Sequence, residues 1–175
     1  MTLFNFDIPS IETDRLILRE PRETDLDAVS AFMASERSHI IGGPMDRVAC
    51  WKLIAGSIGH WALRGYGFWN IENKADGEMV GACGFIFREG WSEPELGWNL
   101  HDGYEGLGFA FEAARAARDY GATHFDLDGV ISYIDPNNHR SIALATRLGA
   151  SFEKAGTLVG HNIHIYRHPK QGAAE

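Results

Sequence analysis

The 175-residue sequence has little cysteine, no long hydrophobic run and no excess of positive charge. Its two cysteines, Cys50 and Cys83, each stand alone in an apolar stretch, which favours reduced thiols over a disulfide framework or a zinc site. No window approaches the about 20 apolar residues of a membrane span, and residues 1–15 lack the basic and apolar regions of a signal peptide. We therefore expect a cytoplasmic protein without a membrane segment or a metal site.

Acidic residues outnumber basic ones by 24 to 16, which gives a net charge of −8. A nucleic-acid-binding surface needs clustered lysine and arginine, so this balance argues against a nucleic-acid partner and mildly favours a cationic one. The length and the 45% hydrophobic content suit one substantial core. We expect a single domain over residues 1–175, with a core of about 12–168 and a short, loose C-terminal tail.

Hydrophobic periodicity predicts the order of strands and helices. Strands are expected at 15–20, 66–73, 79–87, 94–101, 129–135, 151–159 and 162–168, and helices at 21–35, 46–64, 107–120 and 137–149. Thr24 or Asp25 is the expected cap of the first helix, and the second is expected to share one face among Trp51, Ile54, Ile58 and Trp61. This order predicts an α/β (α+β) fold with a mixed, mostly antiparallel central sheet flanked by helices on both faces.

A glycine-rich loop, "GYEGLG" (103–108), lies directly before an alanine-rich helical stretch. A helix N-terminus offers unpaired amides, and glycine lets a bulky anion approach the backbone, so the pattern indicates phosphate binding; a tight turn would explain it equally well. The loop lacks the Lys-Ser/Thr of a P-loop, and Phe111 stands where a dinucleotide fingerprint has its third glycine.

A second motif narrows the choice of ligand. "NNHRSIALATRLGASFE" (137–153) has the form N-x-x-S, with Asn138 and Ser141, followed by an apolar helical face, Leu-Gly and a strand. Together with "YEGLGFAFEA" (104–113) and "TDRLILRE" (13–20), it resembles the GNAT family of acetyl-CoA-dependent N-acetyltransferases, in the RimJ/RimL-like branch. The resemblance covers about residues 12–168 and implies acetyl-CoA as the co-substrate.

The resemblance also implies where the cofactor lies. Its pyrophosphate is expected on the loop amides, and its pantetheine arm where the strand 94–101 parts from the next one. The implied loop residues are Gly106, Leu107, Gly108, Phe109 and Ala110, and those along the pantetheine are Trp98, Asn99, Leu100 and Asn138. The sequence departs from the family pattern twice: Gly103 replaces the usual Arg or Gln, which leaves phosphate contacts to the backbone, and "LGASF" replaces "LGF".

The implied reaction is direct attack of a free amine on the acetyl thioester, for which no cysteine is needed. Glu95 is the candidate general base, acting through water; alternatively it is an exposed carboxylate that only attracts a cationic substrate. Ser141 is the candidate for protonating the departing thiolate, and its alternative role is a helix-cap hydroxyl. Tyr133 is a weaker acid candidate, and His101 is expected at the surface or as a cap.

Three functions remain open on the sequence alone. They are an N-acetyltransferase acting on a protein or peptide α-amino group or a small amine, a non-catalytic acyl-CoA-binding module and, more weakly, a nucleotide-binding fold. The region 39–67, which sets acceptor specificity in the family, carries no motif, and three tryptophans either line an acceptor pocket or belong to the core, namely Trp51, Trp61 and Trp69. Exposed sheet edges often support a homodimer, but no sequence feature determines the oligomeric state.

Overall fold

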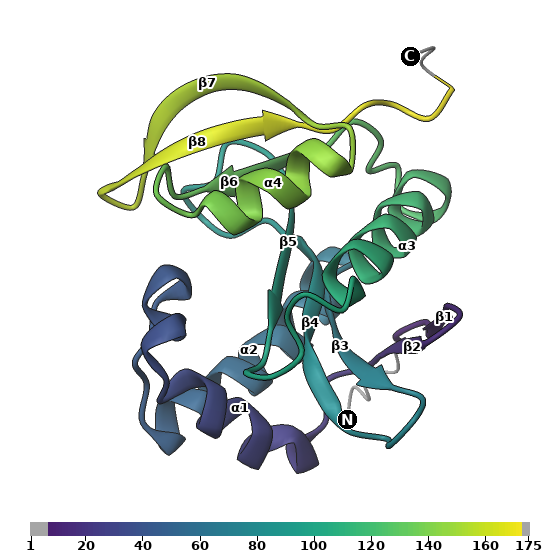
Figure 1. Ribbon diagram of the computed structural model, residues 1–175, viewed down its shortest axis with the longest axis vertical. Helices are drawn as coiled ribbons and strands as arrows, with labels where there is room; N and C mark the ends of the chain where they lie inside the picture. Colours follow the sequence, from purple (N-terminus) through teal and green to yellow (C-terminus); the bar gives the residue numbers. More distant parts are fainter. Residues whose placement is uncertain (1–6, 173–175) are drawn as a thin grey trace, which may run out of the picture.

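The computed structural model describes residues 7–172, which form an eight-stranded sheet (Figure 1). The strands lie in the order β1-β2-β3-β4-β5-β6-β8-β7, and every neighbouring pair is antiparallel except β5 with β6. Their bounds are β1 Ile11–Glu12, β2 Leu16–Arg19, β3 Phe68–Asn73, β4 Met79–Ile86, β5 Glu95–Leu100, β6 Ile131–Ile134, β7 Ser151–Leu158 and β8 His161–Arg167.

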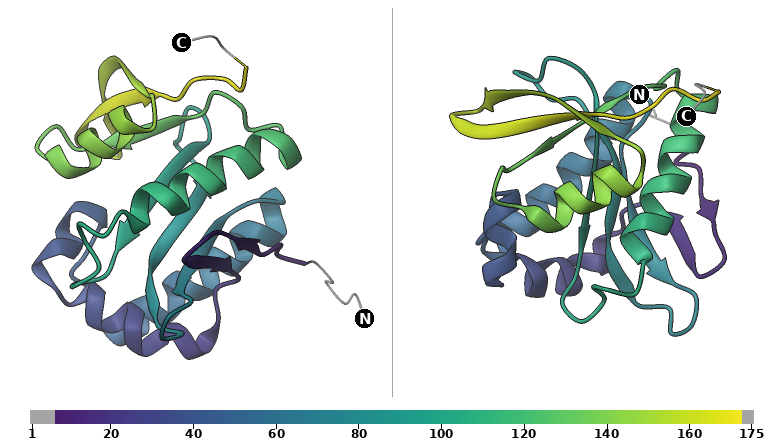
Figure 2. Two further views of the ribbon diagram at one scale, coloured as in Figure 1. Left: turned by 45° about the vertical axis from the view of Figure 1, so that its right-hand side comes forward. Right: turned by 45° about the horizontal axis from the view of Figure 1, so that its top comes forward.

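Helices cover both faces of this sheet, as Figure 2 shows. The α-helices are α1 Leu26–Met33, α2 Arg47–Arg64, α3 Phe109–His124 and α4 His139–Arg147, and two short 3-10 helices are η1 Glu23–Asp25 and η2 Glu36–Ile41. α1 and α2 share one hydrophobic cluster, whereas α3 packs against the other face. The predicted fold class is therefore confirmed. Among the described residues, no helix is long and apolar enough to cross a bilayer.

Every predicted strand and helix is present, although several bounds differ and two short elements, β1 and η2, lie outside the predicted ones. β1 was not predicted, because its two residues are too few to show an alternation. α3 begins at Phe109 rather than Leu107, because Gly108 is its N-cap and has a φ of 82°, in the left-handed region. The loop before α3 is therefore two residues longer than predicted.

Local signals explain where several helices begin and end. Asp46 accepts a 2.7 Å hydrogen bond from the amide of Ala49 at the start of α2, and Asn138 caps α4 through the amide of Ser141 at 3.1 Å. Gly149 follows α4 with a φ of 84°, as expected for a glycine that ends a helix. These signals explain where α2 and α4 begin and where α4 ends.

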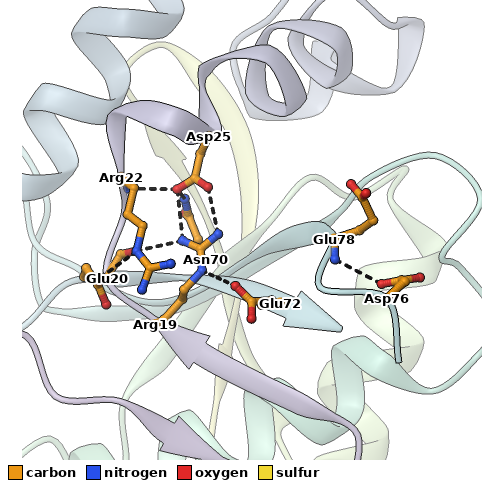
Figure 3. Close-up of polar contacts among 8 residues, drawn as sticks. All are labelled: Arg19, Glu20, Arg22, Asp25, Asn70, Glu72, Asp76 and Glu78. Atoms are coloured by element: carbon orange, nitrogen blue, oxygen red, sulfur yellow. Dashed lines mark hydrogen bonds and ion pairs between the residues drawn. The ribbon is translucent and has the colours of Figure 1, made fainter. Parts of the chain in front are cut away.

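Asp25, one of the two predicted caps, is the N-cap residue of α1, but its carboxylate makes no cap hydrogen bond because it is engaged elsewhere (Figure 3). It accepts hydrogen bonds from Arg19 at 2.8 and 3.1 Å and from the Asn70 amide at 2.7 Å. Burial would raise the pKa of Asp25, but these bonds and one from the backbone of Arg22 outweigh it and lower the pKa below its ordinary value. Arg19 also binds Glu72 at 2.6 Å, so one buried cluster joins β2, η1 and β3.

The tryptophans divide between core and surface. Trp61 and Trp69 are buried, with ring centroids 4.9 Å apart, and they belong to the core rather than to a pocket wall. Trp51 does not share the buried face of α2 as predicted: it is 48% exposed, and its indole donates to Glu23 at 2.8 Å. The apolar spacing of α2 was correct for Ile54 and Trp61 but not for Trp51.

Small residues let α3 lie close to the sheet. Ala113, Ala114 and Ala117 are fully buried, and a Cβ added at Gly121 would lie 2.2 Å from the Phe85 ring. Dense packing of this kind resists displacement, so α3 is a rigid support for the loop at its N-terminus.

Candidate active site

The strands β5 and β6 part almost as soon as they meet. They are in register at a single position, Glu95 opposite Ile131, and Figure 1 shows β5 running away from β6 beyond it. Two side chains replace the missing ladder bonds: the Ser132 hydroxyl donates to the Leu96 carbonyl at 2.6 Å, and the Glu95 carboxylate accepts from the amide of Tyr133 at 2.9 Å. Trp98, Asn99 and Leu100 therefore lie along the open flank of a split in the sheet.

A buried histidine supports this split from behind. Because the Ser132 hydroxyl donates to Leu96, it accepts from the Nε2 of His168 at 3.0 Å. Burial lowers the pKa of His168 to about 4, so the imidazole is neutral at physiological pH. The pair was not predicted, since its two members lie 36 residues apart.

Glu95 lies at the apex of the split. One carboxylate oxygen accepts from the Trp91 indole at 3.1 Å and the other from the Tyr133 amide. Burial raises the pKa of Glu95 to about 7, because these hydrogen bonds offset only part of the desolvation. The Glu95 side chain is therefore half-buried rather than exposed on the strand, and a pKa of about 7 lies in the range that suits a general base.

The glycine loop ends in a row of unpaired amides. Gly106 and Gly108 have φ values of 76° and 82°, which only glycine adopts readily. Within the described part of the chain, no acceptor meets the amides from Gly106 to Phe111. These donors converge at the positive end of the α3 dipole, so the loop suits an anion such as a pyrophosphate.

Glu105 links this loop to its surroundings. Its carboxylate accepts from the Gly103 amide at 2.8 Å, pairs with Arg37 of η2 at 2.7 Å and lies 3.8 Å from Arg140 of α4. Arg37 also binds Asp102 at 2.6 Å. The two motifs that the sequence separates by about thirty residues thus meet in space, through Glu105 and Arg140.

Positive charge reaches the loop from outside it. Gly103 has no side chain that could bind a phosphate. Arg37 and Arg140 lie near the loop because each pairs with the Glu105 carboxylate. Arg15 donates to the Leu107 carbonyl at 2.8 Å. Sequence reasoning missed these contacts, because nothing in the loop indicates partners from the β1–β2 turn, from η2 or from α4.

The N-terminus of α4 borders an open hollow of about 460 Å³, lined by Asp135, Asn137, Asn138, His139 and Arg140. Asn138 uses its side-chain oxygen as the cap, which leaves its amide nitrogen to bind a ligand. Ser141 follows in the first turn, and its backbone amide, not its hydroxyl, takes part in the cap. The Ser141 hydroxyl is therefore not a helix-cap group.

The surroundings of His101 differ from the prediction, and those of Tyr133 do not favour it as the acid. His101 is 8% exposed and stacks on Phe32 with ring centroids 5.0 Å apart, so it is neither a surface nor a cap residue. Burial lowers the pKa of His101 below its ordinary value. The Tyr133 hydroxyl is 2.6 Å from the hydroxyl of Ser92, so it already has a partner. Among residues 7–172, no cluster of His, Cys, Asp and Glu could hold a metal ion.

Comparison with known proteins gives this geometry a family. The family described as "Acetyltransferase (GNAT) domain" matches residues 15–151. An acetyltransferase structure from Agrobacterium tumefaciens is 34% identical, with a TM-score of 0.86 over 97% of this chain and 99% of that one.

Two further proteins are similar to this chain at lower identity. The [ribosomal protein uS5]-alanine N-acetyltransferase of Escherichia coli is 26% identical over 87% of this chain and 84% of its own length. The structure titled RimL, a ribosomal L7/L12 alpha-N-protein acetyltransferase in complex with coenzyme A, has a TM-score of 0.78 at 20% identity, over 94% of this chain and all of the other. At that identity the second similarity shows the fold alone.

Proposed function

This chain belongs to the GNAT acetyltransferase family and is an N-acetyltransferase; we propose that it transfers the acetyl group of acetyl-CoA directly to a primary amine, either the α-amino group of a peptide or protein N-terminus or a small amine. The observation that carries the proposal is Glu95, a carboxyl group with a pKa of about 7 at the apex of the split between β5 and β6. An α-amino group has a pKa of about 8 and a lysine about 10.4, so this base is better matched to the α-amine.

The residues present fit acetyl-CoA, which supplies an activated acetyl thioester when bound. The unpaired amides of Gly106, Leu107, Gly108, Phe109 and Ala110 would hold the pyrophosphate, as anions are held at helix N-termini. The open flank of β5, Trp98 to Leu100, would hold the pantetheine arm through backbone groups, with the Asn138 side chain on the other side.

Glu95 would act as the general base. Each of its oxygens accepts one hydrogen bond, and a carboxylate oxygen can accept a second, so Glu95 can take a proton from the ammonium group through a water molecule. The unprotonated amine then has the lone pair that attacks the thioester carbon. No residue of the chain is acetylated on this route, and both cysteines are buried.

Two groups would handle the charge that develops during attack. An amide on the open flank of β5 would donate to the thioester oxygen, which is typically worth about 3 to 4 kcal/mol in the transition state. The Ser141 hydroxyl would protonate the departing thiolate; it is free for this role because the Asn138 cap uses the Ser141 amide.

The alternative function is a non-catalytic acyl-CoA-binding module, and the hydrogen bonds of Glu95 are compatible with it as well. The carboxylate pins the Tyr133 amide where the strands part, so it also has a purely structural use. Acetyl-CoA turnover with a panel of amines separates the two functions. We expect release of the CoA thiol when an α-amine is present. When the amine is omitted, we expect no acetylated form of the protein. Acetyl-CoA binding with no thiol release on any amine would favour the module.

A further inference from the structure

Three residues, Thr13, Arg15 and Glu112, form a clamp between the turn that joins β1 to β2 and the first turn of α3 (the Arg15 clamp). Both oxygens of Glu112 are engaged. One accepts from the Thr13 hydroxyl at 2.6 Å and the Arg15 amide at 2.9 Å, and the other from the Arg15 guanidinium, Nε and Nη2 each at 2.7 Å. Burial would raise the pKa of Glu112, but these hydrogen bonds lower it, so the carboxylate is charged at neutral pH.

The third nitrogen of the guanidinium reaches the glycine loop itself. Arg15 Nη1 donates to the Leu107 carbonyl at 2.8 Å, and the guanidinium lies 4.8 Å from the centre of the Phe109 ring. A Cβ at Gly108 would lie 3.3 Å from Arg15 Nη2. The planar fork of arginine is what allows one side chain to bind a carboxylate and a carbonyl together.

This contact sets the orientation of one peptide group in the loop. In a planar trans peptide the carbonyl and the following N–H point in opposite directions. With the Leu107 carbonyl held toward Arg15, the amide of Gly108 points away from Arg15, and no acceptor in the described part of the chain meets it. Because residue 108 is glycine, this peptide rotates easily, so a contact from outside the loop can determine its orientation.

We propose that Arg15 is a positioning residue that, held by Glu112 and Thr13, fixes the Leu107–Gly108 peptide so that its amide is ready for the pyrophosphate of acetyl-CoA. This inference rests on the proposed function. Arg15 lies 92 residues before Leu107 in the sequence. It would orient the loop, which Gly103 cannot do because it has no side chain. Arg15 does not touch the reacting atoms.

A direct attraction between Arg15 and the phosphates is the competing explanation, and it predicts the opposite effect at Glu112. If charge alone mattered, Glu112→Gln would remove a negative charge near the phosphates and tighten CoA binding. If positioning matters, the same change releases the guanidinium from its partner and weakens binding. Arg15→Lys makes a second distinction, because lysine keeps the charge but lacks the fork.

The experiment measures CoA affinity by calorimetry for the full chain and the variants Arg15→Gln, Arg15→Lys and Glu112→Gln. Arg22→Gln is the matched control, since its side chain is also 48% exposed and pairs with one surface carboxylate. A hydrogen bond to a charged group is typically worth about ten-fold in an equilibrium constant. We expect each of the three variants to raise the Kd by about that factor and Arg22→Gln to leave it unchanged.

Kinetics then separate positioning from loss of fold. Acetyl-pantetheine lacks the pyrophosphate, so its KM is expected to stay unchanged in Arg15→Gln while the KM for acetyl-CoA rises and kcat at saturation is retained. An equal loss with both substrates, tighter binding by Glu112→Gln, or wild-type affinity in Arg15→Lys would overturn the inference. Absence of CoA binding by the wild-type chain would instead overturn the proposed function.

Discussion

Replacing Glu95 by Gln should change the pH dependence of folding by an amount that the structure specifies. The folded state raises the pKa of this carboxyl group from its ordinary 4.5 to about 7, because burial disfavours the charged form. The folded chain therefore holds the proton more tightly than the unfolded chain does, and the contribution of Glu95 to stability falls as the pH rises from about 4.5 to about 7.

The magnitude follows from about 1.4 kcal/mol for each pKa unit. Relative to Glu95→Gln, the wild-type free energy of unfolding should fall by about 3 kcal/mol across this pH window. Gln offers one acceptor where Glu offers two, so the substitution also loses a hydrogen bond to Trp91 or Tyr133. That loss does not depend on pH, so it shifts the difference between the two proteins without changing its slope.

Urea unfolding of both proteins at a series of pH values from 5 to 8 measures this slope. Glu89→Gln, an exposed carboxylate in the loop before β5, is the matched control. The same Glu95→Gln variant should lose about 100-fold in turnover, the typical contribution of a general base, with little change in CoA affinity. If the unfolding free energies of the wild type and Glu95→Gln changed in parallel with pH, the raised pKa of Glu95 would be refuted. If Glu95→Gln kept wild-type turnover across pH 6 to 9, Glu95 would not be the general base.

Three further variants test separate parts of the structure. Gly108→Val should abolish CoA binding, because a branched side chain at a φ of 82° meets both the Arg15 guanidinium and the pyrophosphate; unchanged affinity in calorimetry would refute the loop assignment. Ser141→Ala should lower kcat about ten-fold or more with an unchanged melting temperature, since the cap uses the backbone amide, whereas an unchanged kcat would exclude the hydroxyl as the acid. Asp25→Asn should lower the free energy of unfolding in urea by about 3 to 5 kcal/mol, because it leaves the buried Arg19 without its main counter-charge. The control Asp27→Asn changes an exposed carboxylate and should lower it by less than about 1 kcal/mol. Equal losses would contradict a stabilising role of the buried pair.

The sequence predicts the parts of this protein whose physical causes are local. Asn138 caps α4 through a residue three positions away, and Gly149 ends the same helix, so both could be read from spacing. The glycine loop and the strand that carries Glu95 are equally local features. For this reason the fold class and the order of elements were predicted correctly, apart from the two-residue β1 and the 3-10 helix η2.

Features that depend on distant partners could not be predicted. The contact of Arg15 with Leu107 spans 92 residues, and no periodicity reports it. His101 follows β5 at the mouth of the glycine loop and was predicted as a surface or cap residue, but α1 places Phe32 over its ring. Glu95 was identified as a candidate base from its place on β5, yet the pKa that suits it to the role arises from its burial beside Trp91 and Tyr133.

One measurement tests the central claim most directly. A peptide with a free N-terminus and an internal lysine is incubated with acetyl-CoA and the purified protein, and fragment mass spectrometry locates the acetyl group. Because the pKa of Glu95 is about 7, we expect one acetyl group on the α-amine, released CoA in equal amount and an unmodified lysine. Acetylation of the lysine alone would contradict the assignment of the acceptor. CoA binding without thiol release, on this peptide and on a panel of small amines, would contradict catalysis itself.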